Sequence, residues 1–370
     1  MLKLIVMKAR RKTVSIISRE SDSKTLDIAM LEEELMKRGV RVRVLSKLLT
    51  KDRSLKALGY AGHVLKQEAA ILSSDVVVLD TYCIPASMFP HRKGTKVVQM
   101  WHALGAIKKF GWQTVGKAGG SSERTARLMR MHHGYDYVVC ASDVTAAHFC
   151  EAFGTERDKI VKCGLPRIDY VKSVASGDLR ENRLERIYKL YPQLKNGRKT
   201  ILYAPTFRKG KAVEAQSLID ALGPDKYNIV VKLHPLYRDA VRTEGEFDTV
   251  IFDEVFPSND WLAAADVIIS DYSSFVIEST LADKPLFIYA YDLEDYQANT
   301  GLNTDFAAEP IAPYVFRDAV SLAKAVDAAC ASDEGYDIRA LRAFRDRYID
   351  IPTDNCTAAL ADFIISLAGR

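Results

Sequence analysis

The chain has 370 residues, a length that accommodates two domains of ordinary size. Hydrophobic residues make up 48% and charged residues 27% of the sequence, as in a soluble globular protein. The net charge of +4 is too small over this length to indicate nucleic-acid binding, and no apolar run approaches the ~20 residues that cross a bilayer. The apolar stretch near the N-terminus is too short for a signal peptide. We therefore predict a cytoplasmic protein.

Six cysteines are scattered along the chain and form no C-x-x-C pair. Several lie in apolar runs, which favours free thiols in a reducing cytoplasm over disulfides or a zinc site.

In the first half of the chain, short apolar runs alternate with amphipathic stretches. The predicted strands are residues 13–18, 40–45, 75–80, 95–100, 135–141 and 160–164, and the predicted helices are residues 24–38, 54–72 and 143–153. Alternation of this kind is typical of a doubly wound parallel sheet.

The alternation starts again after a connector, residues 166–192, that contains one predicted helix at 179–190. Further strands are predicted at residues 200–203, 228–233, 249–252, 267–269 and 286–289, and further helices at 215–222, 259–264, 275–281, 318–331, 338–347 and 355–367, with a loop at 297–312. We predict two Rossmann-like doubly wound domains, 1–170 and 171–354, that face a central cleft. The last segment, 355–370, is expected to pack back on the first domain. Ligands of open α/β domains bind outside the carboxyl ends of the strands.

Residues 266–296 form the most informative unit, because they read as strand, polar turn, helix and strand. Free N–H groups at the start of the helix would favour an anion, and Ser273 and Ser274 could add hydroxyl donors. The same serines would also suit a turn that merely caps the helix. The pattern leaves both interpretations open.

Polar residues follow three other predicted strands. His102 follows one strand, Thr206 and Arg208 follow a second, and His234 follows a third. A histidine can remove a proton from a hydroxyl nucleophile or donate a hydrogen bond to a phosphate, and an arginine offers a planar fork for phosphate oxygens. By contrast, His132 and His133 lie in a basic stretch that we interpret as solvated surface.

These residues belong to a series of motifs that occur in order. They are Trp101-His102 with Lys108-Lys109-Phe110-Gly111, the stretch GLPRID at 164–169, LYAPTFR at 202–208, Leu233-His234-Pro235, and residues 266–296. From about residue 75 to 350 the chain resembles the CDP-glycerol glycerophosphotransferase family, which builds teichoic acids and related capsule polymers. The resemblance implies a two-domain GT-B fold. It also implies that His102 is the catalytic base and His234 a second essential histidine. Ala103 and Ile168 depart from the glycine and asparagine usual in the family.

The implied reaction is attack of an acceptor hydroxyl on the distal phosphorus of CDP-glycerol or CDP-ribitol, with CMP as leaving group. His234, Arg208, Thr206, Ser273 and Ser274 would hold the donor phosphates, and Glu278 could reach the ribose. No cofactor and no obligatory metal are expected. Two alternatives remain: a GT-B glycosyltransferase that uses a nucleotide-sugar, and a non-catalytic scaffold of a cell-wall assembly complex.

The implied acceptor is a lipid-linked saccharide, so the protein is expected to be peripheral on the inner face of the cell membrane. Residues 106–133 combine basic and aromatic side chains, which suits anionic head groups. Within them, Lys108, Lys109, Trp112 and Lys117 are the predicted membrane-facing residues. A solvated basic face is the alternative.

Overall fold

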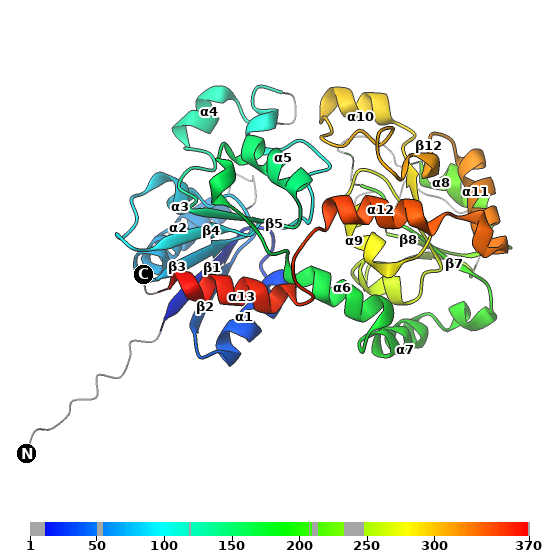
Figure 1. Ribbon diagram of the computed structural model, residues 1–370, viewed down its shortest axis with the longest axis horizontal. Helices are drawn as coiled ribbons and strands as arrows, with labels where there is room; N and C mark the ends of the chain where they lie inside the picture. Colours follow the sequence, from blue (N-terminus) through cyan, green and yellow to red (C-terminus); the bar gives the residue numbers. More distant parts are fainter. Residues whose placement is uncertain are drawn as a thin grey trace, which may run out of the picture.

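Two parallel β-sheets frame two α/β domains that lie side by side (Figure 1). The computed structural model describes residues 12–49, 55–117, 120–206, 208, 214–232 and 248–368. Within these residues each sheet has six strands, and every neighbouring pair is parallel. The predicted fold class is confirmed.

The first sheet has the strand order β2-β1-β3-β4-β5-β6. Its strands are β1 (Thr13–Ser18), β2 (Arg41–Ser46), β3 (Val76–Leu79), β4 (Lys96–Gln99), β5 (Tyr137–Cys140) and β6 (Ile160–Lys162). Its helices are α1 (Leu26–Lys37), α2 (Leu55–Leu72), α3 (Ile84–Met88), α4 (Glu123–Leu128) and α5 (Asp143–Phe153). Every residue of β1 and β3 is buried, as expected for central strands with both faces covered.

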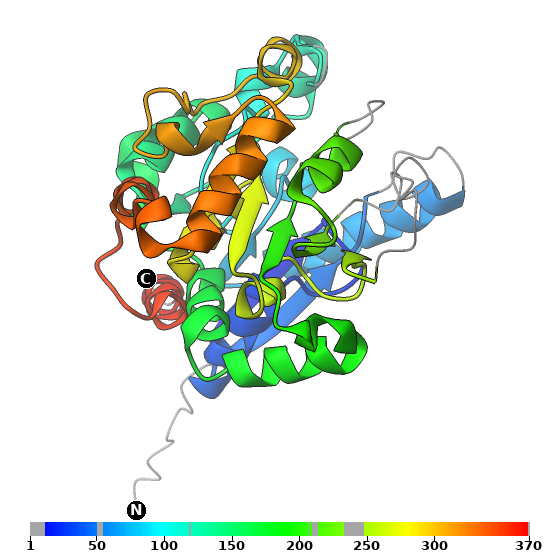
Figure 2. The same ribbon diagram turned by 90° about the vertical axis from the view of Figure 1, so that its right-hand side faces the viewer.

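The second sheet has the strand order β12-β11-β10-β7-β8-β9. Its strands are β7 (Thr200–Tyr203), β8 (Asn228–Val231), β9 (Val250–Phe252), β10 (Val267–Ser270), β11 (Leu286–Tyr289) and β12 (Val315–Phe316). The helices of this half are α8 (Ala215–Leu222), α9 (Phe275–Ser279), α10 (Leu293–Asn299), α11 (Ala319–Ala331) and α12 (Ile338–Tyr348). Figure 2 looks onto this domain, where α11 (orange) packs against α8, β11 and β12.

The strand order reverses once in each sheet. In the first sheet β1 lies between β2 and β3, and in the second sheet β7 lies between β8 and β10. The loops at such a point leave in opposite directions, which opens a crevice outside the carboxyl ends of the two strands. The ends of β1 and β3, and of β7 and β10, are therefore the places where these domains can bind ligands.

Three helices tie the domains together. α6 (Pro166–Ser176) and α7 (Arg180–Leu190) connect the sheets, and α13 (Cys356–Leu367) returns to pack against α1 and α6. The Asp169 carboxylate accepts hydrogen bonds from the N–H groups of Cys356 (2.9 Å) and Thr357 (2.7 Å), and so caps α13. One continuous cluster of buried apolar residues runs from the first sheet through α6 to the second. The predicted boundary between residues 170 and 171 falls within α6.

Most predicted elements agree with the structure to within a few residues, but the connector does not. It contains α6 as well as α7, and α6 begins with Pro166 at its first helical position, where proline is common. α10 extends to Asn299 and so includes the first residues of the predicted loop 297–312. Two acidic residues in its first turn favour that helix. All six cysteines are free, as predicted. Among the described residues, no helix is both long and apolar enough to cross a bilayer.

Candidate active site

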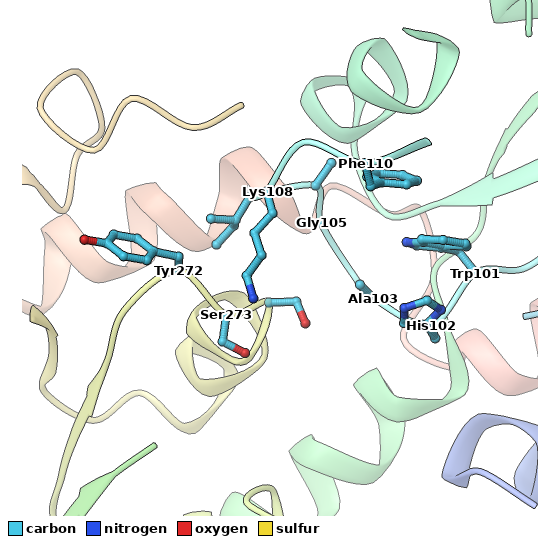
Figure 3. A pocket seen from close by; sticks show the side chains of 11 residues that line it. Trp101, His102, Ala103, Gly105, Lys108, Phe110, Tyr272 and Ser273 are labelled. Atoms are coloured by element: carbon cyan, nitrogen blue, oxygen red, sulfur yellow. The ribbon is translucent and has the colours of Figure 1, made fainter. Parts of the chain in front are cut away.

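A cavity of about 210 Å³ lies where the two domains meet (Figure 3). The first domain contributes the segment after β4, and the second domain contributes the turn after β10. The lining residues are Trp101, His102, Ala103, Gly105, Ala106, Ile107, Lys108, Phe110, Tyr272, Ser273 and Ser274. We call it the reaction cavity, because it brings His102 together with both predicted serines.

His102 lies just beyond the carboxyl end of β4, and its Nδ1 is 2.9 Å from the carbonyl oxygen of Asp80. Because a carbonyl only accepts, Nδ1 carries the proton and Nε2 keeps its lone pair. Burial lowers the pKa of His102 below its ordinary value, and the nearby Glu20 opposes that shift only in part. The ring is therefore neutral at pH 7 and can accept a proton from a hydroxyl group.

The turn that presents His102 is held in an unusual backbone conformation. Trp101 has φ +63°, which is rare for a bulky side chain. Its N–H donates to Oε1 of the buried Gln99 at 2.9 Å, and Nε2 of Gln99 donates to the carbonyl of Thr81 at 3.1 Å. Strain of order 1–3 kcal/mol persists only where surrounding contacts enforce it, and Gln99 supplies these contacts.

The segment after His102 is fixed to the second domain by its backbone. The N–H of Lys109 donates to the carbonyl of Gly301 at 3.0 Å, and the N–H of Asn303 donates to the carbonyl of Ile107 at 2.8 Å. Gly105 is buried at a position where a Cβ would lie 2.2 Å from Cδ1 of Ile277 in α9. A larger residue there would have to displace the side chain of Ile277. The two halves of the reaction cavity therefore meet at a close approach.

Lys108, which was predicted to face a membrane, contributes to the reaction cavity. Its partly buried side chain lines the reaction cavity and extends in the direction of Ser273 (Figure 3). Burial lowers the pKa of Lys108, an effect that the charge of Asp271 opposes and that of Arg208 reinforces. It forms no ion pair with a residue of the described ranges, and its Nζ lies 6.0 Å from the ring centre of Tyr296. A partly buried cation in this setting is suited to a phosphate oxygen.

Ser273 and Ser274 lie between β10 and α9, as predicted. Oγ of Ser273 accepts a hydrogen bond from the N–H of Phe275 at 3.3 Å, so the turn does cap the helix. Both serines also line the reaction cavity. Thr206 follows β7, and its buried Oγ1 has no hydrogen-bond partner among the described residues. Contact of these three residues with a donor phosphate stays a prediction.

The prediction that Arg208 binds phosphate needs correction, because carboxylates already occupy its planar fork. Its Nε and Nη2 donate to Asp292 at 2.6 and 2.9 Å, and its Nη1 donates to Asp271 at 2.7 Å. The side chain is almost fully buried, with a relative exposure of 5%. Asp271 in turn accepts the N–H of Thr206 at 2.8 Å. Arg208 is therefore a positioning residue that holds the ends of β7 and β10 together.

The suggestion that Glu278 reaches a ribose also needs correction. Its Oε1 accepts from Nη1 of Arg167 and its Oε2 accepts from Nδ2 of Asn259, both at 2.9 Å. Nε of Arg167 also donates to Asp27 of α1 at 2.7 Å. Burial would lower the pKa of Arg167, but Asp27 and Glu278 raise it above its usual range. Arg167 thus links the first domain to α9 of the second.

Three further predicted residues, Lys109, Trp112 and Lys117, are not among those that line the reaction cavity. Lys109 packs its aliphatic chain near Gly301, and the indole N–H of Trp112 donates to the carbonyl of Met131 at 3.1 Å. Lys117 is exposed. His234 lies outside the described residues.

The interpretation of His132 as solvated surface is wrong, because only 7% of it is exposed. Its Nδ1 lies 2.9 Å from the hydroxyl of Tyr135, and burial lowers its pKa to about 3. His132 is therefore a neutral residue of the first domain's interior.

Sequence reasoning missed Asp80, which directly follows β3. Only 1% of it is exposed, and neither carboxylate oxygen has a hydrogen-bond partner among the described residues. Burial raises its pKa to about 7, although the nearby hydroxyl of Ser18 opposes the shift. The sequence did contain a signal for this residue, namely an aspartate directly after an apolar strand. In the part of the chain that the structure covers, no group of three or more His, Cys, Asp or Glu residues could hold a metal ion.

The sequence matches, over residues 1–366, the family described as CDP-Glycerol:Poly(glycerophosphate) glycerophosphotransferase. The teichoic acid ribitol-phosphate primase of Bacillus spizizenii (strain ATCC 23059 / NRRL B-14472 / W23) is 32% identical over 305 residues, which cover 79% of this chain and 75% of the relative. The teichoic acid glycerol-phosphate primase of Bacillus subtilis (strain 168) is 30% identical over 311 residues, which cover 82% of this chain and 77% of the relative.

Solved structures share the fold. The wall teichoic acid polymerase TagF superposes with a TM-score of 0.72 at 19% identity, covering 96% of this chain and 88% of that chain. The UDP-GlcNAc 2-epimerase from Neisseria meningitidis superposes with a TM-score of 0.63 at 14% identity, covering 96% of this chain and 100% of that chain. These likenesses support the two-domain GT-B arrangement. The sequence match establishes more: the chain belongs to the CDP-glycerol:poly(glycerophosphate) glycerophosphotransferase family.

Proposed function

We propose that this protein transfers glycerol phosphate or ribitol phosphate from the corresponding CDP-alditol to a hydroxyl group of a lipid-linked saccharide. CMP is the leaving group, and the product belongs to teichoic acid or a related cell-wall polymer. The family match and the two kinds of primase among the relatives support this proposal.

The observation that carries the proposal is the position of a neutral His102 in a cavity that the serine turn of the other domain also lines. Nε2 of His102 takes the proton of the acceptor hydroxyl as its oxygen attacks the distal phosphorus. The bond from that phosphorus to the bridging oxygen breaks, and CMP leaves. Lys108 and the hydroxyls of Ser273 and Ser274 hold the phosphate oxygens on which charge develops.

Arg208 takes a supporting role in this scheme. Its bonds to Asp271 and Asp292 hold the turn after β10 in place, so that the serines need not reorganise when the donor arrives. Thr206 lies at the adjoining strand end, and its buried Oγ1 is a further candidate donor to the diphosphate.

The lipid-linked acceptor places the reaction at a membrane surface, and we propose that the protein is peripheral on the inner face of the cell membrane. The exposed Lys117 and the basic residues around it support such a contact with anionic lipid.

The test is transfer from a panel of CDP-glycerol, CDP-ribitol and UDP-sugars to a short-chain lipid-linked acceptor, with products identified by mass spectrometry. His102→Asn should lower kcat by about 10²–10⁴-fold, while the Kd of the CDP-alditol stays within a few-fold. His133→Asn is the matched control, because His133 is exposed and does not line the reaction cavity.

Transfer from UDP-sugars alone would favour the glycosyltransferase alternative. Absence of transfer with every donor would favour a scaffold. Near wild-type turnover of His102→Asn would remove His102 from the role of base.

A further inference from the structure

A second cavity, of about 450 Å³, adjoins the reaction cavity and is lined by the first domain only. Trp101 and Phe110 line both cavities, and their rings stack with centres 4.7 Å apart. The two spaces therefore meet at this aromatic pair. The ring centre of His102 lies 4.2 Å from that of Trp101, so a molecule that contacts Trp101 in the second cavity is one side chain away from the proposed base.

The second cavity sits where the first sheet reverses its strand order. Arg19 directly follows β1, and Tyr82 lies three residues beyond the end of β3. The N–H of Arg19 donates to Oγ1 of Thr81 at 3.3 Å, which joins the two strand ends. Open α/β sheets bind ligands at this kind of position. The reaction cavity uses the corresponding end of β10 in the second sheet.

Arg19 gives the lining of the second cavity a positive charge. Its guanidinium lies 5.1 Å from the ring centre of Tyr82 and forms no ion pair with a described residue. No aspartate or glutamate is among the described residues that line the cavity, and the pKa of about 3 keeps His132 neutral there. A partly buried arginine without an acidic partner favours a phosphate group.

The rest of the lining suits an amphiphile rather than a free inorganic anion. Leu49, Ile84, Met129 and Met131 offer apolar and adaptable surface, and Thr125 offers a hydroxyl group at the exposed side. A ligand here would have one charged group, a polar portion and an apolar portion. A saccharide joined to a lipid through phosphate has these three parts.

We infer that this second cavity, the head-group cavity, binds the phosphate-linked head of the acceptor, with the phosphate on Arg19. The saccharide then lies toward Trp101 and Phe110, where one of its hydroxyls meets His102. The start of the lipid chain lies against Leu49 and Ile84. This inference rests on the proposed function, because it takes the acceptor to be a lipid-linked saccharide.

The test is calorimetry with one defined probe, a short-chain alkyl diphosphate joined to a disaccharide. Arg19→Gln should weaken probe binding by about tenfold or more, since it removes a charged contact, and Arg19→Lys should retain part of the affinity. Thr125→Trp, which narrows the cavity and keeps Arg19 in the sequence, should also weaken binding of the probe. Arg127→Gln is the matched control, because this exposed arginine on α4 pairs with Glu123 outside the cavity. The Kd of CDP-glycerol should stay unchanged in all four variants.

Several outcomes would overturn the inference. One is that the probe fails to bind wild-type protein, and another is that its affinity is unchanged in both Arg19→Gln and Thr125→Trp. A third such outcome is that these variants lose as much affinity for CDP-glycerol as for the probe. Equal binding of the alkyl diphosphate without its disaccharide would also overturn the placement of the saccharide. If the probe binds through Arg19 while wild-type protein transfers no alditol phosphate, the head-group cavity stands and the proposed function fails.

Discussion

Replacement of Lys108 by methionine tests how the donor diphosphate is held. Methionine keeps much of the aliphatic length that lines the reaction cavity and removes the charge. A hydrogen bond to a charged group contributes about 1.5–3 kcal/mol. The Kd of CDP-glycerol should therefore rise by about 10–150-fold, since each 1.4 kcal/mol is tenfold in affinity.

The same residue predicts how donor binding depends on pH. Burial lowers the pKa of Lys108 from its ordinary value of 10.5. The ammonium form binds the diphosphate, so wild-type affinity should fall as pH rises through that lowered pKa. The donor's negative charge favours the ammonium, and binding at alkaline pH should therefore take up a proton. Lys108→Met should lose this alkaline dependence.

Calorimetry of CDP-glycerol and CDP-ribitol at neutral and alkaline pH is the assay, and Lys109→Met is the matched control. Lys109 neighbours Lys108 in sequence, but its side chain lies near Gly301 and outside the lining of the reaction cavity. An unchanged donor Kd in Lys108→Met would refute the assignment. Loss of vesicle binding by Lys108→Met, with donor affinity intact, would restore a membrane role for this lysine.

Three further predictions concern stability and membrane contact. A raised pKa means that folded Asp80 holds its proton more tightly than the unfolded chain does, so this residue makes the protein less stable as pH rises from about 4 to about 7. Asp80→Asn should remove that dependence. The difference in free energy of unfolding between the variant and wild type, measured with denaturant, should therefore grow by about 2–4 kcal/mol between pH 4 and 8. A difference that stays constant with pH would contradict this. Arg167→Met should destabilise the protein by about 3–5 kcal/mol in the same assay, because the buried Asp27 and Glu278 would lose their cationic partner, and a loss under about 1 kcal/mol would contradict it. Lys117→Glu should reduce co-sedimentation with anionic vesicles at low salt and have less effect at high salt, since one basic residue near such a surface contributes about 1 kcal/mol; equal sedimentation at low salt would exclude this contact.

Much of the fold was accessible from periodicity because the strands are short apolar runs between amphipathic helices. β7, β11, α5 and α8 have the predicted bounds, since each combines a clear period with a plain start and end. α6 was missed because its role is tertiary. Its residues Ile168 and Val171 are fully buried between the domains, and their spacing alone does not distinguish a helix from a connector.

The site was accessible only in part, for a physical reason. His102 follows β4 of the first sheet, and Ser273 and Ser274 follow β10 of the second. Ligands of open α/β sheets bind outside the carboxyl ends of the strands, so the general location of each could be predicted. Whether a charged side chain is free depends on partners far away in sequence. Arg208 meets Asp292 and Glu278 meets Arg167, and no local pattern indicates either pair. Lys108 was misplaced for the same reason, because its position depends on contacts with the second domain.

The size of the reaction cavity limits what it can hold. Its volume of about 210 Å³ is below the ≈300–1,000 Å³ of pockets that enclose a whole drug-sized ligand. We therefore expect it to take the alditol phosphate end of the donor, between His102 and the serine turn. We expect the nucleotide to extend along the second domain, where the end of β7 carries Thr206. A full-length acceptor would exceed this volume as well. We therefore expect it to approach through the adjoining head-group cavity, past Trp101.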